Sequence, residues 1–154
     1  MFRGFDVWIL AISILVVFFL IYVYGFGARD VDNGKVFIDE HEFNVDIADT
    51  ALTRQRGLSG RERLADSEGM LFIFERPGLR RFWMKDMLIP IDIIWISGGK
   101  VVGFEKNVEP EPGVSTLNLR TYSSPQPVEL VLEVAAGTVD RLEIKNGDSV
   151  SIRL

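Results

Sequence analysis

The first hydrophobic pattern along the chain is an uninterrupted apolar run near the N-terminus. From Val7 to Tyr24 there is no charged residue, and Ser13 is the most polar member of the run. Eighteen helical residues span roughly 27 Å, which is close to the hydrocarbon thickness of a bilayer. Trp8 lies at one end and Tyr24 at the other, where amphipathic rings prefer the membrane interface. A core helix of a globular domain would be amphipathic or shorter, so the run predicts a transmembrane helix over residues 7–24.

The length of this run also bears on whether the helix is retained. A secretory signal peptide has a shorter apolar core of about 7–15 residues, followed by small residues at its cleavage site. We therefore expect a signal anchor, with secretion after cleavage near Gly27 as the alternative. Arg3 precedes the helix, so we expect residues 1–6 in the cytoplasm and the C-terminal domain outside a single-pass cell membrane. Residues 25–34 are rich in Gly and Asp and indicate a linker.

From residue 35 onward the apolar positions take the spacing of β-strands. Phe43, Val45 and Ile47 alternate with polar residues, which is the period of a half-buried strand. Met70–Phe74 and Ile93–Ile96 are apolar on both faces, so we expect these strands in the centre of a sheet, covered on both sides. The expected strands cover residues 35–38, 42–48, 70–74, 80–84, 92–97, 100–108, 128–135 and 149–154.

The segments between these strands predict little helix. Thr50 can cap a short helix over residues 52–56, and residues 137–142 indicate one helical turn. Residues 109–127 are rich in Pro, Ser and Thr and predict a long loop. The chain therefore predicts a mainly β domain over residues 35–154, a single sandwich-like or partly closed barrel with one or two short helices.

Composition narrows the function classes. The 154-residue chain has no cysteine, which excludes disulfides, thiolate zinc sites and iron–sulfur clusters. The net charge is −5, although residues 50–85 hold eight basic and four acidic residues and interrupt an otherwise acidic chain. Nucleic-acid-binding domains are usually strongly basic, so we expect no nucleic-acid partner.

The usual catalytic and metal-binding patterns are absent from the sequence. The polar run Asp39–Glu42 contains the only histidine, His41, but successive strand residues point to opposite faces and cannot converge on a metal. The position of His41 in a polar turn also argues against a Ser-His-Asp triad. Ser97 and Lys100 are separated by Gly98-Gly99, which predicts a hairpin turn rather than the helical turn of a serine–lysine pair. We expect no metal and no cofactor.

The most unusual segment runs from Phe82 to Asp92, because Lys85 and Asp92 are embedded in apolar residues. A buried charge needs a partner of opposite sign. We expect Lys85 to pair with Asp92 or Glu133, and Asp86 is a further candidate partner. The alternative is a lysine that extends past the core edge to a surface partner. The candidate polar site consists of Arg56, Arg61, Lys85, Asp86, Asp92 and Glu133.

Short motifs in this region and beyond it follow the order and spacing of a known family. They are Arg56-Gly57-Leu58, Gly69-Met70-Leu71-Phe72, Phe82-Trp83-Met84-Lys85, Asp92-Ile93-Ile94, Leu132-Glu133, Ala136-Gly137-Thr138 and Gly147-Asp148, with Arg61, Leu64, Phe74, Pro90, Asn107, Pro110, Tyr122 and Pro127 among them. On these residues the chain resembles domain-of-unknown-function family 192, a widespread prokaryotic family, over about residues 42–152. Ser59 stands where that family often has methionine, and Asp86-Met87 stands where it often has Asn-Thr.

The resemblance implies a β-rich, sandwich-like single domain, and many members carry an export signal or one membrane helix. It implies no activity and no catalytic residues. We therefore expect a membrane-anchored extracytoplasmic domain that binds a small ligand or an envelope protein, rather than an enzyme. The alternative is an envelope hydrolase with a polar site around Lys85, Asp92 and Glu133. A deep cleft where Lys85, an arginine and a carboxylate converge would favour the hydrolase, whereas a closed surface with Lys85 simply paired would favour the binding module.

The expected topology can be tested with a single cysteine, because the native chain has none. A Ser115→Cys variant should react with a membrane-impermeant thiol reagent in intact cells, since residue 115 belongs to the domain expected outside the membrane. Labelling is measured by gel shift before and after lysis, with the cysteine-free chain as control. Labelling that occurs only after lysis would contradict this topology.

Overall fold

The computed structural model describes residues 32–154, and every structural statement below concerns that part of the chain. The predicted transmembrane helix over residues 7–24 lies outside the described residues. Within residues 32–154 no helix is long and apolar enough to cross a membrane.

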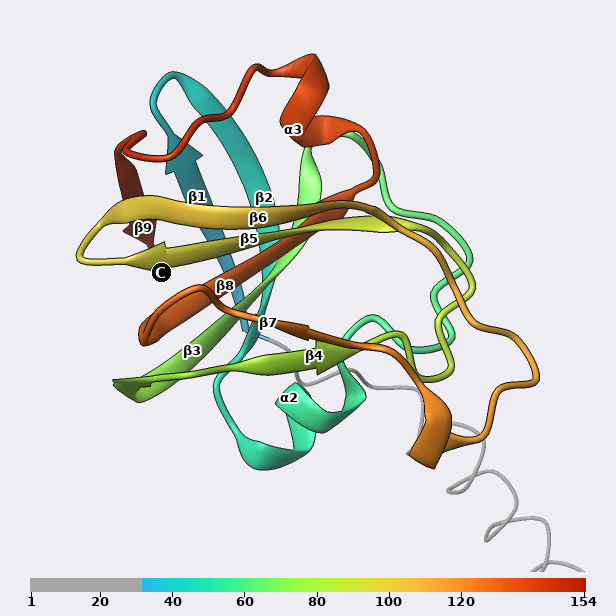
Figure 1. The fold of residues 1–154 in the computed structure, drawn as a ribbon. Coiled ribbons are helices and arrows are strands. Elements are labelled where there is room, and N and C mark those ends of the chain that lie inside the picture. The colour runs from blue at the N-terminus through green and yellow to red at the C-terminus, as the bar shows by residue number, and fades with distance from the viewer. Residues whose placement is uncertain (1–31) are drawn as a thin grey trace, which may run out of the picture. The chain divides into compact units, whose positions relative to one another are not determined.

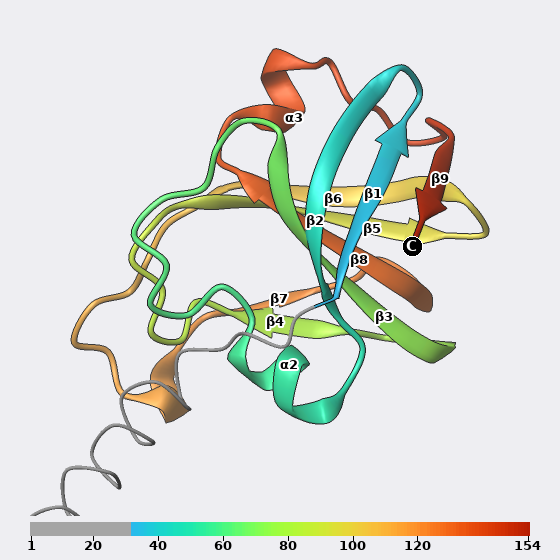
Figure 2. The ribbon, with the colours of Figure 1, turned by 180° about the vertical axis from the view of Figure 1, so that it is seen from behind.

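Most of the described chain forms one curled seven-stranded sheet (Figures 1 and 2). The strand order is β6-β5-β8-β3-β2-β1-β9, and every neighbouring pair is antiparallel except β2–β3. The sheet curls into a half-barrel, and main-chain hydrogen bonds link residues 99–101 at one end of the order to residues 147–150 beside the other. The strands are β1 (Asn33–Ile38), β2 (His41–Ala48), β3 (Glu68–Gly78), β5 (Ile91–Ser97), β6 (Lys100–Val108), β8 (Val128–Ala135) and β9 (Val150–Arg153).

A separate two-stranded ribbon pairs β4 (Arg81–Trp83) with β7 (Thr121–Ser123). Figures 1 and 2 show this ribbon and the helix α2 (Ala51–Arg56) together beneath the sheet. The other helical segments are α3 (Thr138–Arg141) and the 3-10 turn η1 (Thr116–Asn118). The side chain of Thr50 caps α2 and accepts a hydrogen bond from the Thr53 backbone N–H at 3.1 Å, as the sequence predicted for this residue.

These elements confirm the mainly β class and the predicted short helices. The centre of the sheet also matches the prediction, because β3, β8 and β5 lie between other strands. Along β5, Ile94 and Ile96 enter one core cluster while Ile93 and Trp95 enter the other, so this strand is covered on both faces. The sequence missed β7, which lies inside the predicted loop 109–127, and did not place β4 in a ribbon apart from the main sheet.

The two core clusters lie on opposite faces of the sheet. The first cluster takes residues from β1, β2, β8 and α3, among them Val36, Phe43 and Leu132. Phe72, Trp95 and their neighbours form the second cluster, into which residues of β4 and β7 pack. The second cluster is the one over which the candidate site is built.

Asp92 is the most deeply buried charged residue of the described chain, with no exposed surface. Its Oδ1 accepts hydrogen bonds from the backbone N–H groups of Asn107 at 2.8 Å and Gly137 at 3.2 Å, and its Oδ2 accepts one from Val139 at 2.8 Å. Bonds from N–H groups to a carboxylate are charge-assisted and stronger than neutral ones. Asp92 therefore fastens the start of β5 to the end of β6 and to α3, and its partners are main-chain groups rather than Lys85.

Close approach of β3 and β8 requires glycine at position 69. A Cβ atom there would lie 2.6 Å from the backbone oxygen of Glu133, well inside van der Waals contact. We expect Gly69→Ala to lower the free energy of unfolding by about 1–3 kcal/mol, because the two strands must move apart. The measurement is urea unfolding of the full chain in neutral detergent, with tryptophan fluorescence as the signal.

Gly78→Ala is the matched control, since its Cβ would meet only the flexible guanidinium end of Arg80, at 3.2 Å. This variant should unfold at nearly the same urea concentration as the native chain. Equal destabilisation by the two substitutions would contradict the close-approach argument.

Candidate functional site

A pocket of about 290 Å³ opens between α2, β3 and β4 and reaches down to β8. Its floor, walls and rim come from different elements. Residues 54–59 of α2 and the following turn form one side, and β4 with the turn after it forms the other. The pocket is thus placed over the second core cluster, with the sheet beneath it.

Glu133 forms the polar part of the floor. It lies on β8 between Met70 of β3 and Ile93 of β5, and only 5% of the residue is exposed. Its Oε2 has no hydrogen-bond partner among the described residues. Burial raises the pKa of Glu133 to about 8, because desolvation disfavours the charged form. At neutral pH the floor therefore carries a carboxylic acid with its proton on, available to donate one hydrogen bond.

The walls are aromatic. Phe72 and Phe74 point to the same side of β3 because they are two residues apart on one strand. Phe82 of β4 meets Phe72 edge to face, with 4.8 Å between ring centroids and an interplanar angle of 84°. Trp83 lines the mouth of the pocket and remains 48% exposed. This arrangement lines the pocket with aromatic side chains, against which a planar or apolar ligand packs favourably.

The rim is cationic. Arg56 and Arg81 are exposed and form no ion pair within residues 32–154. Arg54 is held in place, since its Nη1 donates to the carbonyl oxygens of Asp49 and Ile73. Four basic residues and one acidic residue line the pocket, and the acidic one is the floor carboxyl.

Lys85 completes the rim, and of its three candidate partners the structure selects Asp86. Its Nζ pairs with Asp86 at 2.5 Å rather than with Asp92 or Glu133. The lysine side chain is 42% exposed, so it is not held in the poorly hydrated place that the surrounding apolar residues suggested. An exposed ion pair of this kind contributes little to stability, and the ammonium remains within the pocket lining.

Two hydrogen bonds tie the opposite sides of the rim together. Ser59 Oγ donates to the Lys85 carbonyl at 2.9 Å, and the Gly60 N–H donates to the Asp86 carbonyl at 2.8 Å. Asp86 has a positive φ of 55°, a backbone conformation that Asp and Asn adopt more readily than other non-glycine residues. Met87, which follows it, is 8% exposed and lines the pocket. The positions where the chain departs from the resembled family thus lie at this rim.

The predicted polar site divides in three. Arg56, Lys85 and Glu133 line one pocket, and Asp86 is bound to its rim. Asp92 and Arg61 lie outside the pocket lining. The aromatic walls and the cations Arg54 and Arg81 were not among the predicted site residues. The two-residue spacing of Phe72 and Phe74 was the signal available for the walls, because it places both rings on one face of a strand.

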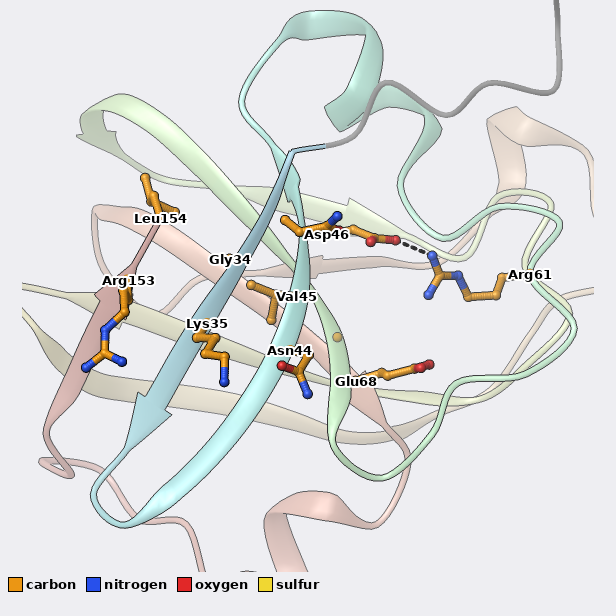
Figure 3. Close-up of a pocket in the computed structure, with 11 residues that line it drawn as sticks. Gly34, Lys35, Asn44, Val45, Asp46, Arg61, Glu68, Arg153 and Leu154 are labelled. Atoms are coloured by element: carbon orange, nitrogen blue, oxygen red, sulfur yellow. Dashed lines mark hydrogen bonds and ion pairs between the residues drawn. The ribbon is translucent and has the colours of Figure 1, made fainter.

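Arg61 lies at a second hollow, shown in Figure 3, over β1 and β2. This hollow is larger, about 570 Å³, and most of its charged side chains are engaged, whereas Arg153 only lies over the Phe37 ring at 5.4 Å from its centroid. Arg61 pairs with Asp46, Lys35 pairs with Glu42, and Glu68 accepts a hydrogen bond from the Ala65 N–H at 3.2 Å. The aromatic pocket is the better candidate for a functional site, because its lining includes the buried carboxyl of Glu133, whose Oε2 has no partner among the described residues.

The fold and the pocket define a mainly β domain whose curled sheet carries a polar-floored, aromatic pocket. The chain belongs to the DUF192 family, described as uncharacterized ACR, whose model matches residues 34–152. This agrees with the family that the sequence motifs indicated.

Two solved structures are similar to the chain. One is a protein from Sinorhizobium meliloti 1021, provisionally described as a transcription regulator, with 28% identity, a TM-score of 0.71 and coverage of 81% of this chain and 97% of that one. The other is a protein of unknown function from Novosphingobium aromaticivorans DSM 12444, with 31% identity, a TM-score of 0.68 and coverage of 79% and 84%. The search of curated proteins found no match.

The raised pKa of Glu133 makes a prediction about stability and pH. Below about pH 4.5 the carboxyl is protonated in both folded and unfolded chains, so it contributes no penalty. Between about pH 4.5 and pH 8 the unfolded chain loses this proton while the folded chain keeps it, and stability falls as pH rises. Glu133→Gln removes this titration, so its stability relative to the native chain should increase by a few kcal/mol from pH 4.5 to pH 8.

The measurement is urea unfolding of the full chain in neutral detergent at several pH values. Glu109→Gln, at an exposed position, is the matched control and should leave the pH dependence of the native chain unchanged. If the difference in free energy of unfolding between the native chain and Glu133→Gln is the same at every pH, burial does not keep Glu133 protonated.

Proposed function

We propose that this protein is a membrane-tethered, extracytoplasmic binding module of the cell envelope, and that the aromatic pocket takes a small ligand. The observation that carries the proposal is the carboxyl of Glu133. It is buried and lies on the pocket floor, and its Oε2 has no hydrogen-bond partner among the described residues.

An unsatisfied buried polar group is unfavourable by about 1–3 kcal/mol, and native proteins rarely contain one without a reason. A ligand that hydrogen-bonds to the carboxyl would remove that penalty. Glu133 also has the strongly perturbed pKa, caused by burial, that is common at functional sites. The pocket volume of about 290 Å³ is near the lower end of the range for small-molecule sites.

The tether in this proposal is the apolar segment 7–24, followed by the linker 25–34. Residues 33 and 34 belong to β1, so the eight residues 25–32 reach at most about 29 Å when fully extended. A retained anchor would therefore hold the pocket within a few nanometres of the membrane surface, where it would meet envelope-derived small molecules at high local concentration.

A hydrolase remains the second candidate, and one observation favours it. The pocket brings Lys85, Arg56 and the protonated carboxyl of Glu133 together, and a carboxyl with a pKa near 8 is suited to act as a general acid. Against it, Asp92, the third residue of the expected polar site, lies outside the pocket lining and accepts three backbone hydrogen bonds. Lys85 is paired with Asp86. We therefore place binding first.

The test uses the full chain in neutral detergent, with its three tryptophans replaced by 5-fluorotryptophan. Trp83 lines the mouth of the pocket, whereas Trp95 is buried and Trp8 belongs to the predicted membrane segment. Benzoate, benzamide, benzyl alcohol and benzylamine are titrated in turn and the fluorine resonances are followed by NMR.

A saturable shift of the Trp83 resonance by at least one compound, without a parallel shift of Trp8, is the expected result. Glu133→Leu should weaken that shift. A pocket that none of the four compounds perturbs would contradict the binding proposal. Turnover of matching phenyl esters, lost in Glu133→Gln, would instead favour the hydrolase.

A further inference from the structure

We propose that the pocket selects an organic anion with a flat apolar body, whose charged group lies at the rim and whose opposite end carries a neutral hydrogen-bond acceptor at the floor. This inference rests on the proposed function, since it names the class of ligand that the same pocket would hold.

The rim argues for negative charge on the ligand. Arg56 and Arg81 have no acidic partner among residues 32–154, so their guanidinium groups are open to a ligand. Arginine binds carboxylate and phosphate groups through two parallel hydrogen bonds, which adds geometric selection to the charge. A ligand ammonium at the same place would be repelled by these groups. The shared chemistry is therefore a carboxylate or a phosphate.

The walls argue for a flat apolar body between the two polar ends. Phe72, Phe74 and Phe82 surround the space above the floor, and Met87 closes one side. Aromatic side chains pack favourably against ring edges and faces. The volume of about 290 Å³ equals roughly ten water molecules at liquid density, so a single substituted ring fills the pocket.

The floor argues for an acceptor rather than a second charge. Oε2 of Glu133 has no hydrogen-bond partner, and the carboxyl forms no ion pair with the rim cations, among the described residues. A protonated carboxyl donates one hydrogen bond, and a ketone or ester oxygen on the ligand would accept it. A ligand with no polar atom at this end would leave the floor unsatisfied.

Four matched probes separate these requirements. 4-Acetylbenzoate has both the anion and the acceptor. 4-Isopropylbenzoate replaces the carbonyl oxygen by a methyl group of similar size, 4-acetylbenzamide replaces the anion by a neutral amide, and 4-acetylbenzylamine replaces it by a cation. Binding to the full chain in dodecyl maltoside is measured from the 5-fluorotryptophan resonance of Trp83, with protein-free micelles as control.

We expect 4-acetylbenzoate to bind at least about ten-fold more tightly than the other three probes, because the amide and the amine lose the charge-assisted bonds to arginine and the isopropyl compound leaves the floor donor unpaired. Arg56→Gln together with Arg81→Gln should abolish the preference for the anion. Arg63→Gln, at an exposed position outside the pocket lining, is the matched control and should leave it unchanged. Glu133→Leu should remove the preference for acetyl over isopropyl, while Glu133→Gln, which still donates, should retain most of it.

The outcomes distinguish the two proposals. Equal binding of the amide or the amine would overturn the anion inference and leave the pocket as a binding site. Equal binding of the isopropyl compound would overturn the role of Glu133 as donor. If no probe perturbs Trp83 and the variants behave like the native chain, both the inference and the proposed function fail.

Discussion

The pairing of β8 with β3 on one side and β5 on the other is the constraint on which the domain depends. This strand joins the β9-β1-β2-β3 part of the sheet to the β5–β6 hairpin. Its register sets Glu133 between Met70 and Ile93, on the face that carries the second core cluster. A slip by one residue would turn Glu133 into the other cluster and move a leucine or valine to the floor. The polar floor is thus a direct product of strand register.

Asp92 supports that register from the end of the neighbouring strand. Its carboxylate is bound by three backbone N–H groups, from Asn107 near the end of β6 and from Gly137 and Val139 after β8. The two segments that leave the sheet on either side of β5 are thereby fixed to it. A charge that looked like a candidate for chemistry serves instead as an internal cap, since its hydrogen-bonding capacity is used by the main chain.

The sequence predicted what depends on local pattern. Alternating apolar residues indicated β2, double-sided apolar runs indicated the central strands β3 and β5, and Thr50 marked the start of α2. The ribbon strand β7 was missed because three residues, Thr-Tyr-Ser, are too short to show a period. Lys85 and Glu133 line one pocket, and Lys85 pairs with Asp86 rather than with the favoured Asp92 or Glu133, because apolar neighbours along the chain do not reveal that the ammonium reaches solvent. The aromatic pocket depends on the packing of α2 and β4 over the sheet, which no local pattern contains.

The pocket floor and the pocket rim belong to different parts of the architecture. The floor residue, Glu133, lies on the central strand β8, so a substitution there also changes the packing of the core. The rim comes from α2 and the turn after β4, which are tied to each other by the bonds from Ser59 and Gly60. Ser59 and Asp86 lie outside every strand, so we expect substitutions at these rim positions to leave the hydrogen-bonded sheet intact. Such a division separates the positions where a change alters only the pocket mouth from the positions where a change alters the whole sheet.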